Sequence, residues 1–167
     1  MTERLWAPWR LEYVTQGAKK PGCIFCDALA MGDDVPARIL LRAKWNFVII
    51  NIYPYNNGHL MIVPYEHLTT PLDATHDQTA EMMDLLKVCQ RVLTEAYHPE
   101  GLNIGMNLGK CAGAGVLEHY HLHIVPRWGG DTNYMTATGE TRVLIEDLAD
   151  TDARLRPLFA AYAEPQK

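Results

Sequence analysis

Three histidines at every second position, His119, His121 and His123, constrain the fold of this chain more than any other feature. The residues between them are apolar or aromatic, and a period of two is the period of a β-strand. The spacing therefore predicts a strand over residues 119–126 with all three imidazoles on one face. Because imidazole suits proton transfer, nucleophilic attack and metal binding near neutral pH, this stretch is the predicted active site.

The three histidines are too far apart to bind one ion together. Alternate strand residues lie about 6.6 to 7 Å apart, so His119 and His123 are about 13 Å apart along the backbone, whereas zinc holds nitrogen ligands at about 2.0 to 2.1 Å. We therefore expect one end histidine to join a metal site elsewhere and the middle one to face a substrate. A strand of structural histidines is the alternative. A metal hydrolase that uses the triad as ligands is disfavoured by the distance.

The pattern His-φ-His-φ-His-φ-φ, where φ is apolar, is matched by residues 119–125 and resembles the signature of the histidine triad (HIT) nucleotide-binding superfamily. The resemblance covers about residues 22–128. Its other matching segments, in family order, are residues 22–26, 51–67 and 101–103. The flanks at 5–10 and 126–134 resemble the bacterial branch that contains diadenosine tetraphosphate phosphorylases.

The rest of the pattern predicts an α+β fold, because runs of strands surround one long helix without regular βαβ alternation. The expected strands are 39–41, 47–50, 60–63, 102–107 and 119–126, and the amphipathic helix runs from about 77 to 97. The resemblance implies a HIT-like fold: an antiparallel sheet of about five strands, one long helix and a short C-terminal helix. It also implies a homodimer that pairs through a helix and an edge strand.

Length and composition predict a single cytoplasmic domain. The chain of 167 residues with 48% hydrophobic content suits one domain. The resemblance implies that this is a HIT domain over 1–167, with an N-terminal arm (1–21), a core (22–128) and a C-terminal extension (129–167). The net charge of −5 disfavours nucleic acid, and no run approaches the roughly 20 apolar residues of a membrane span, so neither is an expected partner. Four cysteines without a leading apolar stretch indicate a reducing compartment.

Cys23 and Cys26 have the two-residue spacing at which two thiolates bind one tetrahedral metal ion. The resemblance implies that His67 and His119 complete a structural Zn²⁺ site with four protein ligands and no position for water. A redox pair and two free thiols are the alternatives. The redox reading is weaker because the βαβ context that usually supports it is missing.

If a metal ion holds His119, the next histidine, His121, is the candidate nucleophile. A neutral imidazole can attack an α-phosphorus and form a covalent nucleotidyl-histidine, which splits one difficult substitution into two easier ones. On the same face, His123 would contact phosphate oxygens or protonate the leaving group. The family places a fourth active-site histidine at His59, which would support the site or contact phosphate, or be structural.

Candidate nucleotide-binding residues lie in two other segments. The glycine-rich stretch 107–115 is expected to offer donors to phosphate, with these candidates: Asn107, Lys110, Gly113 and Gly115. Asn51 is the candidate ribose contact, with a turn-capping role as the alternative. The base-pocket candidates, which are equally ordinary core residues, are Ile24, Phe25 and Ile49.

The sequence departs from the better-known HIT branches just before the triad. Those branches carry Gln and then Ser or Thr four and three residues before the first triad histidine, whereas Gly115 and Val116 stand here. The change removes side-chain donors that usually help with leaving-group transfer. More backbone contacts through the glycines, or a larger substrate, would fit.

The leading hypothesis is a nucleotidyl transferase or hydrolase that binds an adenine nucleotide or dinucleoside polyphosphate. Within it, a diadenosine tetraphosphate phosphorylase of the ATP adenylyltransferase type, producing ATP and ADP, comes first. Hydrolysis of dinucleoside polyphosphates or of adenosine phosphoramidates is the alternative, and a non-catalytic nucleotide-binding regulatory protein is the alternative of another class. The expected cofactor is Zn²⁺, and Mg²⁺ accompanying the substrate stays open.

Overall fold

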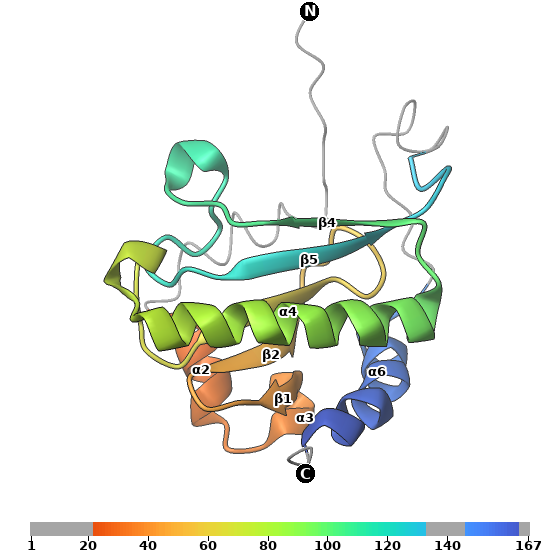
Figure 1. Ribbon diagram of the computed structural model, residues 1–167, viewed down its shortest axis with the longest axis horizontal. Helices are drawn as coiled ribbons and strands as arrows, with labels where there is room; N and C mark the ends of the chain where they lie inside the picture. Colours follow the sequence, from red (N-terminus) through yellow and green to blue (C-terminus); the bar gives the residue numbers. More distant parts are fainter. Residues whose placement is uncertain (1–21, 133–145, 164–167) are drawn as a thin grey trace, which may run out of the picture.

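A five-stranded antiparallel sheet with helices on both faces forms the body of the computed structural model, which describes residues 22–132 and 146–163 (Figure 1). The N-terminal arm expected at 1–21 and residues 133–145 of the expected extension lie outside the described residues. The α+β fold predicted from the sequence is confirmed. Among the described helices, none is long and apolar enough to cross a membrane.

The strand order in the sheet is β1-β2-β3-β5-β4, so the last strand in sequence inserts between β3 and β4. The strands are β1 (Ile39–Arg42), β2 (Asn46–Ile50), β3 (Leu60–Pro64), β4 (Gly101–Gly105) and β5 (Leu122–Arg127). Antiparallel pairing aligns Met61 of β3 with His123 of β5, and Gly105 of β4 with the same histidine. His123 therefore lies within the sheet, where β3 and β4 flank it.

The long helix α4 (His76–Tyr97) covers one face of the sheet (Figure 1). Thr75 and Gln78 form a capping box at its start, and His98 ends it in a left-handed conformation with φ 46°. The buried side of α4 joins the larger core through Met82, Leu85, Cys89, Val92 and Leu93. The expected C-terminal helix is α6 (Leu148–Ala163), which packs against α4 and β1.

A second, smaller core lies around the short helices α2 (Ile24–Ala30) and α3 (Asp34–Ala37), which the sequence patterns did not predict. Alternate residues of β2 and β3 contribute to the two cores, so every residue of both strands is buried. This explains why both strands read as continuous apolar runs rather than as alternating ones.

The strand expected over 119–126 is wrong at its start, because β5 begins only at Leu122. β3 ends at Pro64, which has no N–H to extend a ladder, and the N–H of Tyr120 donates to the carbonyl of Leu68 at 2.8 Å instead. Residues 119–121 thus leave the sheet. The strand expected at 102–107 is also shifted, since β4 ends at Gly105.

Glu81 on α4 anchors the tight turn between β1 and β2. Its carboxylate accepts hydrogen bonds from the backbone N–H groups of Lys44, Trp45 and Asn46 at 2.7 to 2.9 Å, and from the Asn46 side-chain amide at 2.9 Å. Because Asn46 is fully buried, these donors need a partner within the protein. The helix therefore fixes the register of the first hairpin.

Candidate active site and metal centre

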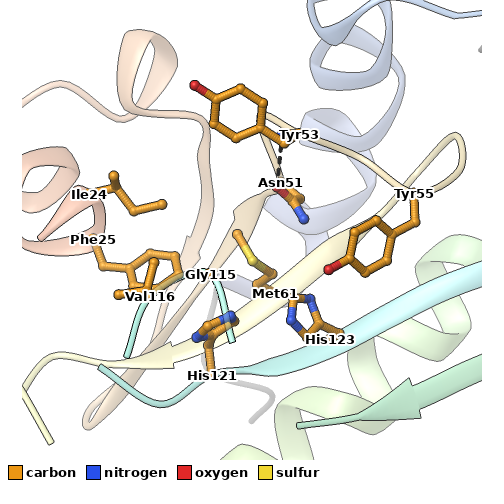
Figure 2. A pocket seen from close by; sticks show the side chains of 10 residues that line it. All are labelled: Ile24, Phe25, Asn51, Tyr53, Tyr55, Met61, Gly115, Val116, His121 and His123. Atoms are coloured by element: carbon orange, nitrogen blue, oxygen red, sulfur yellow. Dashed lines mark hydrogen bonds between the residues drawn. The ribbon is translucent and has the colours of Figure 1, made fainter. Parts of the chain in front are cut away.

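A pocket opens beside β3 and β5, on the side of the sheet where α2 packs (Figure 2). Its lining comes from α2, the β2–β3 loop, β3, the segment before the triad and the triad itself: Ile24, Phe25, Asn51, Tyr53, Tyr55, Met61, Gly115, Val116, His121 and His123. The pocket thus has an apolar wall on α2 and imidazoles at its base.

His121 is held in one tautomer by the backbone. Its Nδ1 lies 2.9 Å from the main-chain oxygen of His119, and because a carbonyl only accepts, Nδ1 carries the proton. The lone pair of the neutral ring is therefore on Nε2. Burial lowers the pKa of His121, which is 5% exposed, so the ring is neutral near pH 7. A neutral imidazole with a lone pair on Nε2 is the form a nucleophile requires.

A chain of hydrogen bonds likewise fixes the tautomers of His59 and His123. The backbone N–H of Tyr55 donates to His59 Nδ1 at 3.0 Å, so the proton of neutral His59 is on Nε2. That nitrogen lies 2.9 Å from His123 Nδ1 and donates to it. His123 must then carry its own proton on Nε2, and it can present a donor to a ligand.

His59 lies behind His123 rather than in the pocket. It is 1% exposed, and burial, followed by the nearby His123 and His121, holds the pKa of its ring well below the ordinary value. The ring of Tyr55 packs against it with centroids 4.7 Å apart. Of the two roles expected for His59, this position favours support of His123 over direct contact with phosphate.

Asn51 combines the two readings that its sequence position left open. Its Oδ1 accepts from the backbone N–H of Tyr53 at 2.9 Å, which is an Asx-type turn. Its Nδ2 lies 3.2 Å from His59 Nδ1. Asn51 also lines the pocket (Figure 2), so it caps the turn and borders the site at once.

The four predicted metal ligands gather at the other end of the triad. The ligand atoms of Cys23, Cys26, His67 and His119 all lie within 4.8 Å of one another. His119 Nδ1 is 3.3 Å from the Cys23 sulfur, and His67 Nδ1 is 3.3 Å from the Cys26 sulfur. Tetrahedral zinc with bonds of about 2.0 to 2.3 Å places its ligand atoms roughly 3.3 to 3.8 Å apart, so this donor set fits the ion.

His119 is oriented for metal binding by its second nitrogen. Nε2 lies 2.9 Å from the carbonyl oxygen of Pro64 and must donate to it, which leaves the Nδ1 lone pair for a metal ion. Burial lowers the pKa of His119, and a neutral ring is the form that binds metal. The triad therefore divides as predicted, with His119 among the cysteines and the other two histidines at the pocket.

The HIT domain family model matches residues 33–130, which is more than half of the chain. The chain belongs to the HIT family. An "AP-4-A phosphorylase" of Mycobacterium tuberculosis is 37% identical over 157 residues, covering 89% of this chain and 80% of that protein. An "adenosine 5'-monophosphoramidase" of Schizosaccharomyces pombe is 30% identical over 105 residues, covering 63% of this chain and 74% of that protein.

Solved HIT structures share this fold. A Zn-bound histidine triad family protein from Mycobacterium smegmatis superposes with a TM-score of 0.67 at 26% identity, covering 84% of this chain and 95% of that one. A hypothetical histidine triad nucleotide-binding protein from Sulfolobus tokodaii gives a TM-score of 0.66 at 25% identity, covering 83% of this chain and 93% of that one.

The structure brings only part of the predicted phosphate loop of this HIT domain to the pocket. Gly115 lines it, whereas Asn107, Lys110 and Gly113 are not among the lining residues, and the last two are exposed. Two glycines of the loop, at positions 109 and 113, are exposed and have the positive φ that favours glycine. Ile49, an expected base contact, packs in the smaller core instead.

Sequence reasoning missed four lining residues of the HIT pocket: Tyr53, Tyr55, Met61 and Val116. The two tyrosines carried a usable signal, since two aromatic side chains in a turn just before a candidate catalytic histidine are unusual for a solvated loop. Met61 carried none, because it reads as an ordinary core residue of a strand. It reaches the pocket through its pairing with His123.

Proposed function

We propose that this HIT protein is a diadenosine tetraphosphate phosphorylase that acts through a covalent nucleotidyl-His121. At the coarser level it is a nucleotide-processing enzyme of the HIT family. The observation that carries the proposal is the His121 tautomer, fixed by the carbonyl of His119 within a pocket bordered by an apolar wall. The 37% identity over most of the chain to an AP-4-A phosphorylase supports this substrate.

The reaction proceeds in two displacements at one phosphorus. In the first, Nε2 of His121 attacks an α-phosphorus, a P–N bond forms, and the P–O bond to the departing ATP breaks. His123 donates a hydrogen bond from its Nε2–H to the leaving oxygen and keeps its proton, so ATP departs as the anion. The hydrogen bond from His59 Nε2 to His123 Nδ1 keeps that donor in place. In the second, inorganic phosphate attacks the same phosphorus, the P–N bond breaks, ADP leaves, and His121 is neutral again.

The lining of the pocket suggests how the nucleotide lies. Ile24 and Phe25 form the apolar wall for the base, and Asn51 offers an amide beside the ribose. Phosphate oxygens face His123 and the backbone near Gly115. Because Gly115 and Val116 have no polar side chain, this site relies on main-chain donors where other HIT branches have Gln and Ser or Thr.

We further propose that Zn²⁺ binds between Cys23, Cys26, His67 and His119. With four protein ligands, the ion supplies no water for chemistry and serves only to join α2, the segment after β3 and the triad. The Zn-bound state of a structural neighbour supports this assignment. Two thiolate ligands require reducing conditions, in keeping with the cytoplasmic location that stays a prediction.

A homodimer is also proposed, through β4 at the edge of the described sheet. Among the described strands β4 pairs with β5 alone, and Ile104 at its centre is 45% exposed. An apolar, uncovered edge strand is prone to pair with another chain. A second copy of β4 would extend the sheet.

Product analysis tests the activity. The purified protein is incubated with diadenosine tetraphosphate, with and without inorganic phosphate, and His121→Ala serves as the control. We expect ATP plus ADP only when phosphate is present, and no turnover by the variant although it still binds AMP. Full activity of His121→Ala would contradict the covalent mechanism.

The same experiment distinguishes the second candidate function, hydrolysis. The identity to an adenosine 5'-monophosphoramidase favours water as the acceptor and a P–N bond as the target. ATP plus AMP without phosphate would assign the protein as a dinucleoside polyphosphate hydrolase. Turnover of an adenosine phosphoramidate alone would assign it to that class, and AMP binding without any turnover would indicate a regulatory protein.

A further inference from the structure

We propose that Phe25 is a positioning residue through which the metal centre and the nucleotide pocket raise each other's ligand affinity. The inference rests on the proposed function, because it takes the pocket to bind an adenine nucleotide. It also goes beyond it, since a structural zinc need not influence the substrate at all. Three connections between the two sites carry the inference.

The first connection is covalent. Cys23 and Cys26 flank Ile24 and Phe25, so the two sulfur ligands enclose the two residues that form the apolar wall of the pocket. Cys23 is the N-cap of α2 and makes no side-chain capping hydrogen bond there. Because the first turn of a seven-residue helix is weak by itself, metal binding at both ends of this segment would fix the wall.

The second connection is the ring of Phe25. It is 1% exposed and lies between the two sites: its centroid is 5.4 Å from the ring of His119, edge-on at 77°, and 4.9 Å from the ring of His121. One aromatic side chain therefore contacts both a metal ligand and the nucleophile. Figure 2 shows Phe25 and Ile24 on one side of the pocket, with Tyr55 and His123 on the other.

The third connection is the backbone of the triad. The side chain of His119 belongs to the metal cluster, while its main-chain oxygen accepts the hydrogen bond that sets the His121 tautomer. Any shift of His119 on metal loss would therefore move the acceptor of His121 and the ring packed on Phe25. Without the ion, a nucleotide must order this segment as it binds, which weakens its affinity.

Linkage makes the effect reciprocal, so it is measurable from either side. If the metal ion tightens nucleotide binding by some factor, the nucleotide tightens metal binding by the same factor. Coupling of the usual size changes the affinity for the other ligand about 5- to 150-fold. We expect at least the lower end of this range for Zn²⁺ and AMP, because the pocket wall and two metal ligands occupy four consecutive residues.

The test measures Zn²⁺ affinity of the full chain by competition with a chromophoric chelator, under reducing conditions, with and without saturating AMP. AMP titration of the zinc-loaded protein is measured in parallel. The variant is Phe25→Leu. The matched control is Phe47→Leu, because Phe47 is equally buried in the same small core but stacks on Tyr65 at 5.4 Å, away from both histidines. Circular dichroism compares the folding of each variant.

We expect AMP to lower the zinc dissociation constant of the wild type at least about fivefold. Phe25→Leu should reduce this ratio, because the ring contacts are lost while the two connections through the chain remain, and Phe47→Leu should retain it. Equal zinc affinity with and without bound AMP overturns the inference. So does an unchanged ratio in Phe25→Leu, or an equal loss in Phe47→Leu, which would indicate a general effect of the core. Absence of AMP binding to the zinc-loaded wild type overturns the proposed function, and the inference with it.

Discussion

Replacing His59 by leucine tests the tautomer chain most directly. His59 Nε2–H donates to His123 Nδ1 at 2.9 Å, and leucine fills similar space without a donor. His123 can then place its proton on Nδ1, which leaves a lone pair rather than a donor facing the leaving oxygen. We expect turnover to fall while substrate binding changes little, because His59 does not line the pocket.

The size of the effect follows from the lost hydrogen bond. A buried acceptor left without a donor costs about 1 to 3 kcal/mol. If the whole loss appears in the transition state, at about 1.4 kcal/mol per factor of ten, kcat falls about 5- to 150-fold. A glutamine at position 59 can place an amide N–H near the same acceptor, so His59→Gln should recover most of the rate.

Steady-state kinetics on diadenosine tetraphosphate with saturating phosphate measures both variants. The expected signature is a lowered kcat with a nearly constant KM in His59→Leu, and partial rescue in His59→Gln. An unchanged kcat in His59→Leu would refute the reasoning, because His123 would then need no donor behind it. An equally slow His59→Gln would show that ring packing against Tyr55, rather than the hydrogen bond, is what matters.

We also expect His59→Leu to change how the unfolding free energy depends on pH. Burial holds the folded-state pKa of His59 below its unfolded value of about 6.5, so the unfolded state binds more protons as the pH falls. The stability that this group contributes is complete above pH 6.5 and is lost as the pH falls toward the folded pKa. Leucine does not titrate. Between pH 7.5 and 5.5 the wild type should therefore lose about 1 kcal/mol more unfolding free energy than His59→Leu, measured by urea denaturation.

Three further predictions concern the framework of the site. Glu81→Gln should lower the unfolding free energy by roughly 2 to 4 kcal/mol, because the carboxylate accepts four hydrogen bonds at the first hairpin. Urea denaturation measures this loss of stability, with exposed Glu95→Gln as the control. An equal loss in the control would contradict the account. Cys23→Ser should purify with little zinc by elemental analysis and melt at a lower temperature than the wild type. The exposed control Cys111→Ser should keep the zinc content and melting temperature of the wild type. Full zinc content in Cys23→Ser would remove that cysteine from the ligand set. Ile104→Lys should shift the protein from dimer to monomer in light scattering, and an unaltered dimer would place the interface elsewhere.

Local sequence patterns predicted the long helix and the first three strands. The helix α4 was found because apolar residues recur at the helical period, and β1, β2 and β3 were found as short apolar runs separated by turn residues. By contrast, α2 and α3 gave no such signal. Helices of seven and four residues are unstable alone, and these form because residues such as Phe25 and Ala37 are buried against the sheet.

The sequence and the resemblance also predicted four side chains that the structure does bring together as a possible metal-binding cluster, apart from His121 and His123 at the pocket. Spacing identified Cys23 and Cys26 as a ligand pair, and the strand distance argued that His119 and His123 serve different sites. The phosphate loop was harder to predict. Glycines indicate that a chain can bend, but which of them faces the pocket depends on where the loop leaves β4, so only Gly115 lines it.

The sequence by itself determined which chemical groups this protein has: two thiols at metal-binding spacing, and imidazoles alternating along one segment. Only the tertiary structure decided where the protons of those imidazoles lie. The partners that fix them are mostly backbone groups, namely the carbonyl oxygens of Pro64 and His119 and the N–H of Tyr55. Every residue has such groups, so the sequence does not reveal which of them will face a histidine. Folding brings these backbone groups to the histidine rings. Because a carbonyl oxygen only accepts and a backbone N–H only donates, each of these rings is left with a single neutral tautomer.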